Sequence, residues 1–214
     1  MKILTLVSIL SLSLLFDSIL DFIALTARHA RVDTGSSSWL PRLERHFYQA
    51  DAVVHWTLSV ADRATGWLSD PFHASFRELM LHAATREDLF CPAYCLMPDH
   101  IHFVWMGLRR DSDQLNAMAF LRTYLEPLLA PQKFQHQPYD HVLRQEERRQ
   151  DAFATVCYYV LANPERKGLV KRWQEWPYGS AVVPGYPKLH PTEDDFWEKF
   201  WKLYYRFQED IKRT

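Results

Sequence analysis

Two histidines stand two positions apart in the middle of the chain, within the run MPDHIHFVW at residues 97–105. Neighbouring residues on a strand point to opposite faces, so His100 and His102 share one face with Val104 and Met106. The residues between them are all apolar and predict a buried opposite face. Strand geometry spaces the two imidazole-bearing residues about 6–7 Å apart, which suits a shared metal ion or a polarised oxyanion.

A phenol and a carboxamide stand four positions apart near the end of a predicted helix. Tyr159 and Asn163 therefore project from the same helix face, one turn apart. With the two imidazoles they offer two nitrogens and one oxygen to a divalent ion, a mixture that suits Mg²⁺ or Mn²⁺ better than a closed zinc site. The step to Asn163 favours Tyr159 over Tyr158, which we expect to pack against the core. Asn163 has a second interpretation, because asparagine before proline is also a common helix-stop residue.

The elements that must position these residues follow from periodicity and turn signals. The sequence predicts a strand at 53–60, a helix at 70–88 capped by Asp70, two strands within 90–108 that meet at Pro98-Asp99, a helix at 112–130 capped by Ser112 or Asp113, a strand at 139–144, and a helix at 146–164 ended by Pro164. The order β-α-β-β-α-β is that of a ferredoxin-like split βαβ layer. We therefore expect an α+β fold with an antiparallel sheet flanked by helices, and the tyrosine-bearing helix after the core.

Composition divides the chain into three parts. We expect an apolar extension and linker at 1–45, a folded domain at 46–182, and an aromatic and acidic tail at 183–214 in which 196–207 form a helix docked on the domain. The apolar start is too short to span a bilayer comfortably. A secretion signal, an amphipathic appendage and a translated upstream segment all remain open for it.

The 214 residues, 48% of them hydrophobic, predict one globular domain and exclude a disordered chain. Cys91, Cys95 and Cys157 form no disulfide framework, which favours a reducing, cytoplasmic setting. Cys91 and Cys95 lack the second pair of a zinc site, so we predict packed thiols. The net charge of −1 gives no general preference for nucleic acid.

Basic residues gather locally on both sides of the predicted tyrosine helix. The candidates for nucleic-acid contacts are Arg144, Arg148, Arg166 and Lys167, although a solvated helix face explains each cluster equally well. The segment from Arg166 to Gly168 also fits a helix-ending turn with a left-handed glycine. Three further polar residues, His55, Asp140 and His141, stay open between a structural role and an auxiliary role at the site.

Two motifs together resemble a known family. His100-Ile101-His102, followed after a helix by YVLANPERKGLV at 159–170, is similar to the REP-associated tyrosine transposases, within the single-tyrosine HUH transposase family of bacteria. Those proteins typically carry MPDHIH and a helix ending in Tyr-x3-Asn-Pro-x-Arg-x-Gly-Leu-Val. The segment WPYGSA at 176–181 resembles the family too, whereas Lys167 stands where a small residue is common. The resemblance covers roughly residues 46–182.

The resemblance implies a chemistry. Tyr159 would attack a phosphodiester and form a 5′-phosphotyrosine, while His100, His102 and Asn163 hold Mg²⁺ or Mn²⁺. It implies single-stranded or hairpin DNA as substrate, no nucleotide cofactor, no membrane partner, a monomer or homodimer, and a cytoplasmic, nucleoid-associated location. The sequence does not name the base that deprotonates the phenol. Two alternatives are a DNA-binding module or repressor that has lost catalysis, and a metal-dependent hydrolase that uses His-x-His to activate water.

Overall fold

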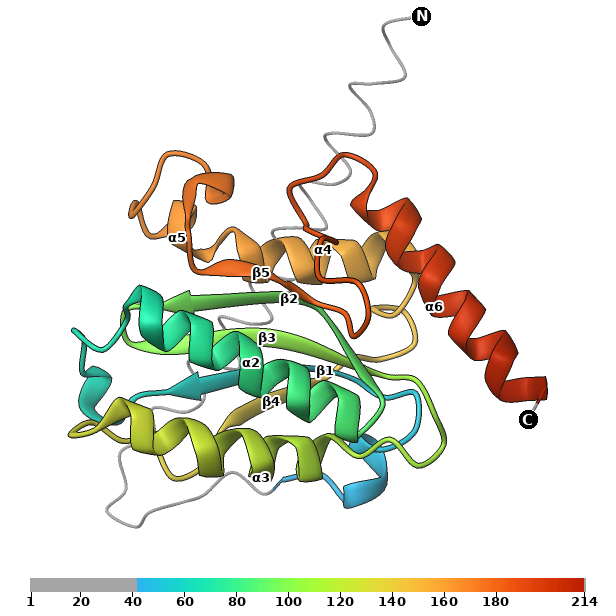
Figure 1. The fold of residues 1–214 in the computed structure, drawn as a ribbon, viewed down its shortest axis with the longest axis horizontal. Coiled ribbons are helices and arrows are strands. Elements are labelled where there is room, and N and C mark those ends of the chain that lie inside the picture. The colour runs from blue at the N-terminus through green and yellow to red at the C-terminus, as the bar shows by residue number, and fades with distance from the viewer. Residues whose placement is uncertain (1–41, 214) are drawn as a thin grey trace, which may run out of the picture. The chain divides into compact units, whose positions relative to one another are not determined.

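Five antiparallel strands form the sheet that carries the two histidines (Figure 1). The computed structural model describes residues 42–213, so most of the predicted extension at 1–45 lies outside the described residues. The strands are β1 (Val53–Ser59), β2 (Leu89–Met97), β3 (His100–Gly107), β4 (Tyr139–Val142) and β5 (Gly179–Val182), in the spatial order β4-β1-β3-β2-β5. The order of the first four is that of the predicted ferredoxin-like layer, and the predicted α+β class is confirmed.

The central strand β3 pairs with β1 on one side and with β2 on the other. The β2–β3 connection is the two residues Pro98 and Asp99, with Met97 opposite His100, so the predicted hairpin is confirmed. The edge strand β5 was not predicted. It is four residues long and pairs with β2, and its sequence is too short to show a strand pattern without that partner.

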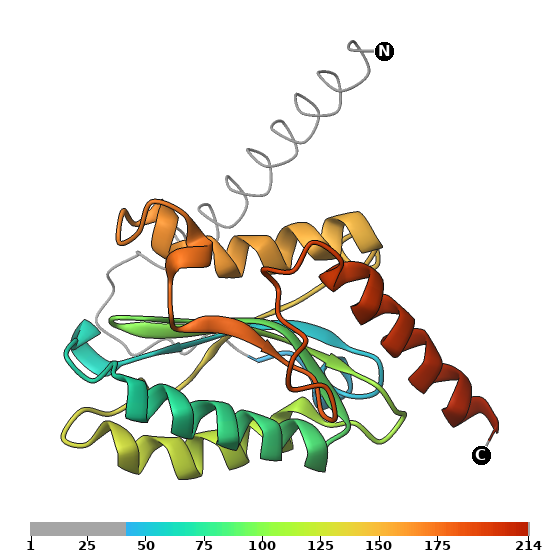
Figure 2. The ribbon, with the colours of Figure 1, turned by 45° about the horizontal axis from the view of Figure 1, so that its top comes forward.

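Helices cover both faces of this sheet (Figures 1 and 2). They are α2 (Asp70–Arg86), α3 (Gln114–Leu125), α4 (Gln150–Leu161), α5 (Asn163–Arg166) and α6 (Phe196–Arg213), with 3₁₀ turns at Arg45–Tyr48, Ala61–Arg63, Glu126–Leu129 and Trp173–Glu175. Figure 2 shows α2 and α3 on one face and α4 on the other. The histidine-bearing face is the one that α4 covers, because Val104 and Met106 of β3 share a core with side chains of α4.

The alternation of β3 divides the interior into two cores. Phe103 and Trp105 pack with α2 and α3, whereas Val104 and Met106 pack on the other side of the sheet with α4 and α6. All four are buried. Burial of each such side chain stabilises the fold by about 1.5–3 kcal/mol, so a one-residue slip of β3 would expose both sets.

The helix starts differ from the sequence prediction at two places. Ser69, not Asp70, caps α2, because its hydroxyl accepts a hydrogen bond from the Phe72 backbone N–H, and Asp70 lies already inside the helix. Asp113 caps α3 by accepting hydrogen bonds from two backbone N–H groups. Of the two predicted caps, Ser112 and Asp113, the structure therefore selects Asp113. An N-cap side chain must lie outside the helix to reach back to these groups.

The helix that bears Tyr159 is shorter than predicted at both ends. It begins at Gln150 rather than 146, because the Glu147 carboxylate accepts from the Arg144 backbone N–H and holds the preceding residues in a turn. It ends at Leu161, and Pro164 lies in the first turn of α5 instead of stopping α4. Proline has no N–H to lose in a first turn, so it fits there without strain.

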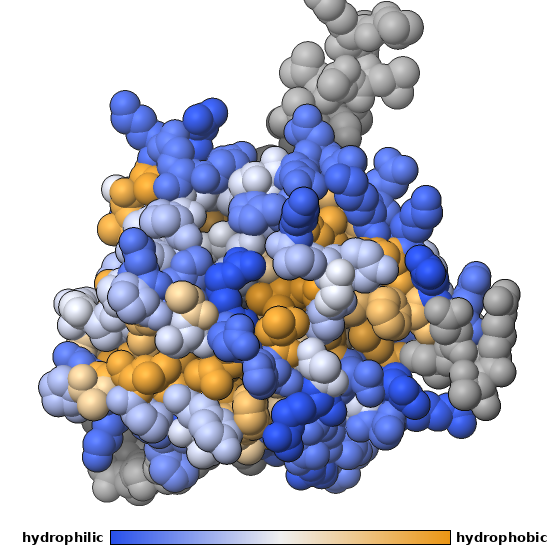
Figure 3. All heavy atoms as spheres, in the orientation of Figure 1, coloured by the Kyte–Doolittle hydropathy of each residue, from blue (hydrophilic) through white to orange (hydrophobic). Residues whose placement is uncertain are grey.

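The predicted tail helix is present as α6 and runs on to Arg213. Its residues Phe196 and Phe200 are buried in the core beneath α4. Residues Leu43–Thr214 form one compact unit. On the face seen in Figure 3, apolar side chains gather between α2 and α3 and between α2 and α6, among mostly hydrophilic surroundings. Among the described residues, no helix is both long and apolar enough to cross a bilayer.

Candidate active site

The two imidazoles of β3 converge on each other. Their Nε2 atoms lie 2.9 Å apart and their ring centroids 4.5 Å apart, with the rings perpendicular. The predicted 6–7 Å therefore describes the backbone spacing, and the side chains turn toward a common point. The other nitrogen of each ring faces the protein: His100 Nδ1 lies 2.6 Å from Asp99 Oδ1, and His102 Nδ1 lies 3.0 Å from Thr57 Oγ1.

Asp99 determines which nitrogen of His100 is free to bind. Burial alone would raise the pKa of Asp99, but the hydrogen bond from His100 and the nearby Arg63 guanidinium lower it. An ionised carboxylate only accepts hydrogen bonds, so His100 Nδ1 donates and Nε2 carries a lone pair. That lone pair faces His102 Nε2, a contact that needs either a proton on His102 or a cation between the rings. A carboxylate behind a histidine is the usual arrangement at metal sites.

Burial keeps these imidazoles neutral. It is the largest cause that lowers the pKa of His102 well below its ordinary value, and the charges of His55 and His100 act in the same direction. The pKa of His100 is also lowered, mainly by burial. His55 lies behind His102, with its Nε2 3.2 Å from His102 Nδ1, and burial lowers its pKa to about 3. A neutral imidazole is the form that binds a metal.

The geometry fits an open site for a divalent ion. Two metal–imidazole bonds of about 2.0–2.1 Å at a right angle hold their nitrogens about 3 Å apart, close to the separation of the Nε2 atoms here. Within residues 42–213, no group of three or more His, Cys, Asp or Glu side chains is arranged to hold a metal. An ion at this place would therefore have the two imidazoles as its nitrogen donors.

Asn163 supports the end of α4. Its side-chain nitrogen donates to the backbone carbonyls of Tyr159, at 2.8 Å, and Val160, at 3.2 Å, and the residue is buried. These bonds satisfy carbonyls that a helix end leaves unpaired. The helix-end interpretation of Asn163 is thus confirmed, and its Oδ1 is the ligand group that the amide could still offer to an ion.

Tyr159 lies on the histidine-bearing side of the sheet. The edge of its ring packs against His55, with centroids 6.3 Å apart and planes at 75°. The Arg166 guanidinium carbon lies 4.3 Å from the centre of the Tyr159 ring. Through His55, the phenol is in contact with the same group of rings that holds His102.

Tyr158 does not pack against the core, contrary to the sequence prediction. It is 42% exposed, and its ring meets Trp173 with the centroids 6.3 Å apart. The buried side of α4 is defined by Phe153 and Cys157, and the next position after Cys157 turns about 100° away from the sheet. Partial burial and the charge of Glu165 raise the pKa of the Tyr158 hydroxyl above its ordinary value.

The four candidate basic residues fall into two groups. Arg166 and Lys167 lie near the histidines, where their charges lower the pKa values of His102 and His100. They are followed by Gly168 at φ +70°, so the predicted left-handed turn is confirmed.

Arg144 and Arg148 lie at the other end of β3. The Arg148 guanidinium donates to the Asp51 carboxylate at 2.7 Å. Arg144 follows Leu143, whose N–H bonds to Val53, the β1 partner of Met106. Met106 is six positions along β3 from His100, so this group lies about 20 Å from the paired imidazoles. The sequence had placed these residues on both sides of one predicted helix, and the structure puts the two groups at the two ends of α4.

Sequence reasoning undervalued three neighbours of the site. His55, taken more readily as structural, faces the same surface as His102, and Thr57 holds His102. His55 and Thr57 are two positions apart in VVHWTLSV at residues 53–60, and this alternation was the signal in the sequence that they share a strand face. Asp99 was interpreted only as part of a turn, although it directly precedes His100.

Of the remaining candidates, His141 and Cys95 lie on the histidine-bearing face as the strand partners of His55 and His102, whereas Asp140 faces the other side of the sheet. Asp140 accepts a hydrogen bond from Tyr48 on the opposite face of the sheet, and His141 pairs with Glu147 at 2.9 Å. All three cysteines are free and buried, and burial raises the pKa of Cys91 to about 12. The predicted packed thiols are confirmed.

Comparison with known proteins gives relatives in both sequence and structure. No family model matches the chain. A putative REP-associated tyrosine transposase of Haemophilus influenzae is 23% identical over 164 residues, which cover 70% of this chain and 90% of the relative. A solved structure of a REP-associated tyrosine transposase bound to a REP hairpin superposes with a TM-score of 0.55 at 18% identity, covering 66% of this chain and 81% of that one. The resemblance to REP-associated tyrosine transposases that the two motifs carry is therefore confirmed.

Proposed function

We propose that this chain is a metal-dependent, single-stranded DNA endonuclease and strand transferase, a transposase that acts through a 5′-phosphotyrosine on Tyr159. The names of its relatives support the coarser part, a DNA-processing transposase. The finer part rests chiefly on one observation: the Nε2 atoms of His100 and His102 converge at 2.9 Å on the side of the sheet where Tyr159 lies.

In this proposal the chain binds a phosphodiester between the paired imidazoles and the phenol. His100, His102 and Asn163 would hold Mg²⁺ or Mn²⁺, which supplies charge neutralisation for the non-bridging oxygens and orients the phosphate. Asp99 holds His100 in the tautomer that leaves Nε2 available. Exposed Arg166 and Lys167 add positive charge beside the site and favour binding of the DNA backbone.

The covalent step exchanges one phosphorus–oxygen bond for another. Tyr159 Oη loses its proton to solvent and bonds to phosphorus, the bond to the 3′ oxygen breaks, and that oxygen takes up a proton as a 3′-hydroxyl. The 5′-phosphotyrosine retains the bond for transfer to another 3′-hydroxyl, so no nucleotide cofactor is needed. Single-stranded or hairpin DNA is the substrate, and a cytoplasmic location and a monomeric or dimeric state remain predictions.

The decisive experiment follows label from DNA to protein. Labelled hairpin DNA with a single-stranded flank is incubated with the full chain and Mn²⁺, then denatured and separated by electrophoresis. We expect a covalent adduct that Tyr159→Phe abolishes, that Tyr158→Phe retains, and that EDTA prevents. Tyr158→Phe is a matched control, because it removes the same hydroxyl from the adjacent, outward-facing position.

The other outcomes assign the alternatives. Cleaved DNA without an adduct would indicate a hydrolase, and a reversible mobility shift alone would indicate a binding module. An adduct lost in Tyr158→Phe and kept in Tyr159→Phe would refute the assignment of the nucleophile.

A further inference from the structure

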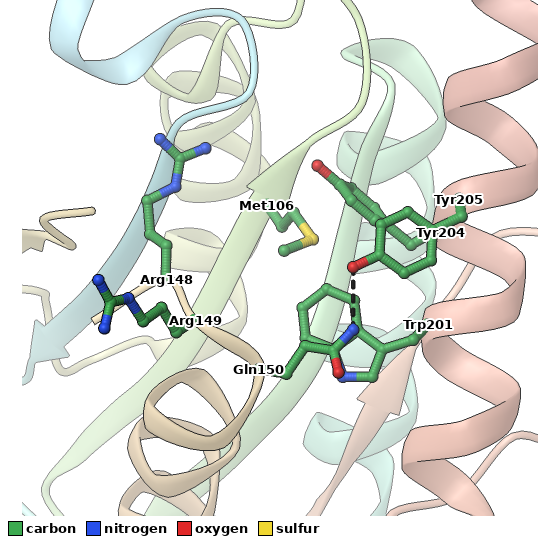
Figure 4. Close-up of a pocket in the computed structure, with 7 residues that line it drawn as sticks. All are labelled: Met106, Arg148, Arg149, Gln150, Trp201, Tyr204 and Tyr205. Carbon is green, nitrogen blue, oxygen red and sulfur yellow. Dashed lines mark hydrogen bonds between the residues drawn. The ribbon is translucent and has the colours of Figure 1, made fainter. Parts of the chain in front are cut away.

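A polar hollow lies at the opposite end of α4 from Tyr159. It has a volume of about 440 Å³ and lies between the start of α4 and the C-terminal helix α6. Figure 4 shows the Arg148 and Arg149 side chains on one side, the rings of Trp201, Tyr204 and Tyr205 on the other, and Met106 between them. The volume lies within the range of small-molecule sites. None of the proposed catalytic chemistry uses this hollow.

The aromatic side offers ring faces that are held in place. Trp201 and Tyr205 stack at 28° with centroids 6.0 Å apart, and Tyr204 meets Trp201 edge-on. Gln150 Nε2 donates to the Tyr205 hydroxyl at 2.9 Å, which links α4 to α6 across the hollow. Tyr205 is nevertheless 49% exposed, so part of its ring remains open to a ligand.

The basic side carries one fixed and one available guanidinium. Arg148 is held by Asp51. The Arg149 side chain is exposed and has neither a hydrogen bond nor an ion pair within the part of the chain that the structure describes. The adjoining hollow is lined by Asp151 and Glu198, whose carboxylates would repel a phosphate. An anionic ligand is thereby directed to the arginine side.

We propose that this hollow binds one nucleotide of single-stranded DNA, with its base on the Trp201–Tyr205 rings and its phosphate on Arg149. Ring faces combined with guanidinium groups are how proteins hold single strands without reading sequence. The hollow is about 20 Å from His100 along β3, a distance spanned by about six phosphates of a stacked strand. The proposal needs binding only and stands apart from the proposed cleavage.

Binding of fluorescein-labelled (dT)10 to the full chain, measured by anisotropy at several salt concentrations, tests the proposal. We expect Arg149→Gln to weaken binding about tenfold and to reduce the slope of log K against log salt by about 0.7, the loss of one phosphate contact. Tyr205→Leu should weaken binding about tenfold through lost stacking, with the slope unchanged. A (dT)10 analogue without bases should bind the wild type more weakly than (dT)10 does. On Tyr205→Leu the two strands should bind with equal affinity.

Two controls match these changes. Lys202→Gln removes an exposed charge from α6 at a separate hollow, and Tyr124→Leu removes an exposed tyrosine from α3. Both should bind (dT)10 within about twofold of the wild type, and all variants should melt at the wild-type temperature. Wild-type affinity in either pocket variant, or equal binding of the abasic strand to the wild type, would overturn the proposal. Adduct formation on hairpin DNA is scored separately, so its failure would reject the cleavage proposal and leave this one standing.

Discussion

At the scale of single residues, the site depends on which ring nitrogens are free. Asp99 accepts from His100 Nδ1 at 2.6 Å and pairs with Arg63 at 3.1 Å. This arrangement fixes one tautomer of His100, so the Nε2 lone pair is already directed at the position that the proposed cation would take. The carboxylate is a positioning group, because it holds His100 and does not itself face the second imidazole.

Replacement of Asp99 tests this role. Asp99→Asn removes the charge and allows the amide to donate to His100 Nδ1, which would turn the ring proton to Nε2. We expect Mn²⁺ affinity, measured by isothermal titration calorimetry, to fall about 10- to 100-fold, with the same direction of change in adduct yield. Asp111→Asn, at an exposed carboxylate beyond the end of β3 opposite His100, is the control. Unchanged Mn²⁺ affinity in Asp99→Asn would show that the tautomer is fixed by other groups.

At the scale of elements, helix α2 meets β2 through a partly buried polar contact. The Tyr94 hydroxyl accepts from Arg77 at 2.7 Å and lies 2.9 Å from His73 Nε2. Because Arg77 donates a hydrogen bond to the Tyr94 oxygen, the Tyr94 O–H can donate a hydrogen bond in turn to Nε2 of a neutral His73. Burial and the charge of Arg77 lower the pKa of His73 from 6.5 to about 4.

This contact predicts acid sensitivity. Between pH 6.5 and 4 the unfolded chain protonates His73 and the folded chain does not, so the free energy of unfolding falls as the pH falls through this window. The contribution is about 2 kcal/mol, reduced from the full shift because His73 is only half-buried. Urea denaturation at pH 7 and pH 4.5 should show a smaller loss in His73→Gln than in the wild type. His82→Gln, at an exposed histidine of the same helix, should behave as the wild type does.

At the scale of the whole molecule, α4 connects the two proposed sites, and α6 completes the core beneath it. Tyr159 lies toward the end of α4 and Gln150 at its start, about 14 Å apart along the axis. Phe200 of α6 is fully buried and stacks on Phe153 of α4 at 6.3 Å, so the C-terminal helix supports the same helix that positions the phenol.

Truncation of Phe200 tests this support. Phe200→Ala should lower the free energy of unfolding by about 3–5 kcal/mol, because it leaves a cavity between α4, α6 and the sheet. Lys202→Ala, two positions away and exposed, should change it by no more than about 0.5 kcal/mol. Chemical denaturation followed by tryptophan fluorescence measures both. Equal stability of the two variants would mean that α6 adds nothing to the fold of the remaining chain.

The sequence alone determined the elements whose signals are local. Alternation in β3 separated the histidine face from the apolar face, and the Pro98-Asp99 turn set the hairpin, whereas Tyr159 and Asn163, expected on one helix, lie in α4 and α5. These patterns need only near neighbours in the chain, because strand and helix periods follow from backbone geometry. The antiparallel α+β layer followed from the order of the elements.

The tertiary structure decided what depends on partners distant in the sequence. The short strand β5 exists through its pairing with β2, and Tyr158 turns outward because Phe153 and Cys157 fix the buried side of α4. The convergence of two imidazoles from 6–7 Å of backbone spacing to 2.9 Å between nitrogens depends on side-chain rotation held by Asp99 and Thr57. Rotation about side-chain bonds responds to contacts in space, which the order of residues does not specify.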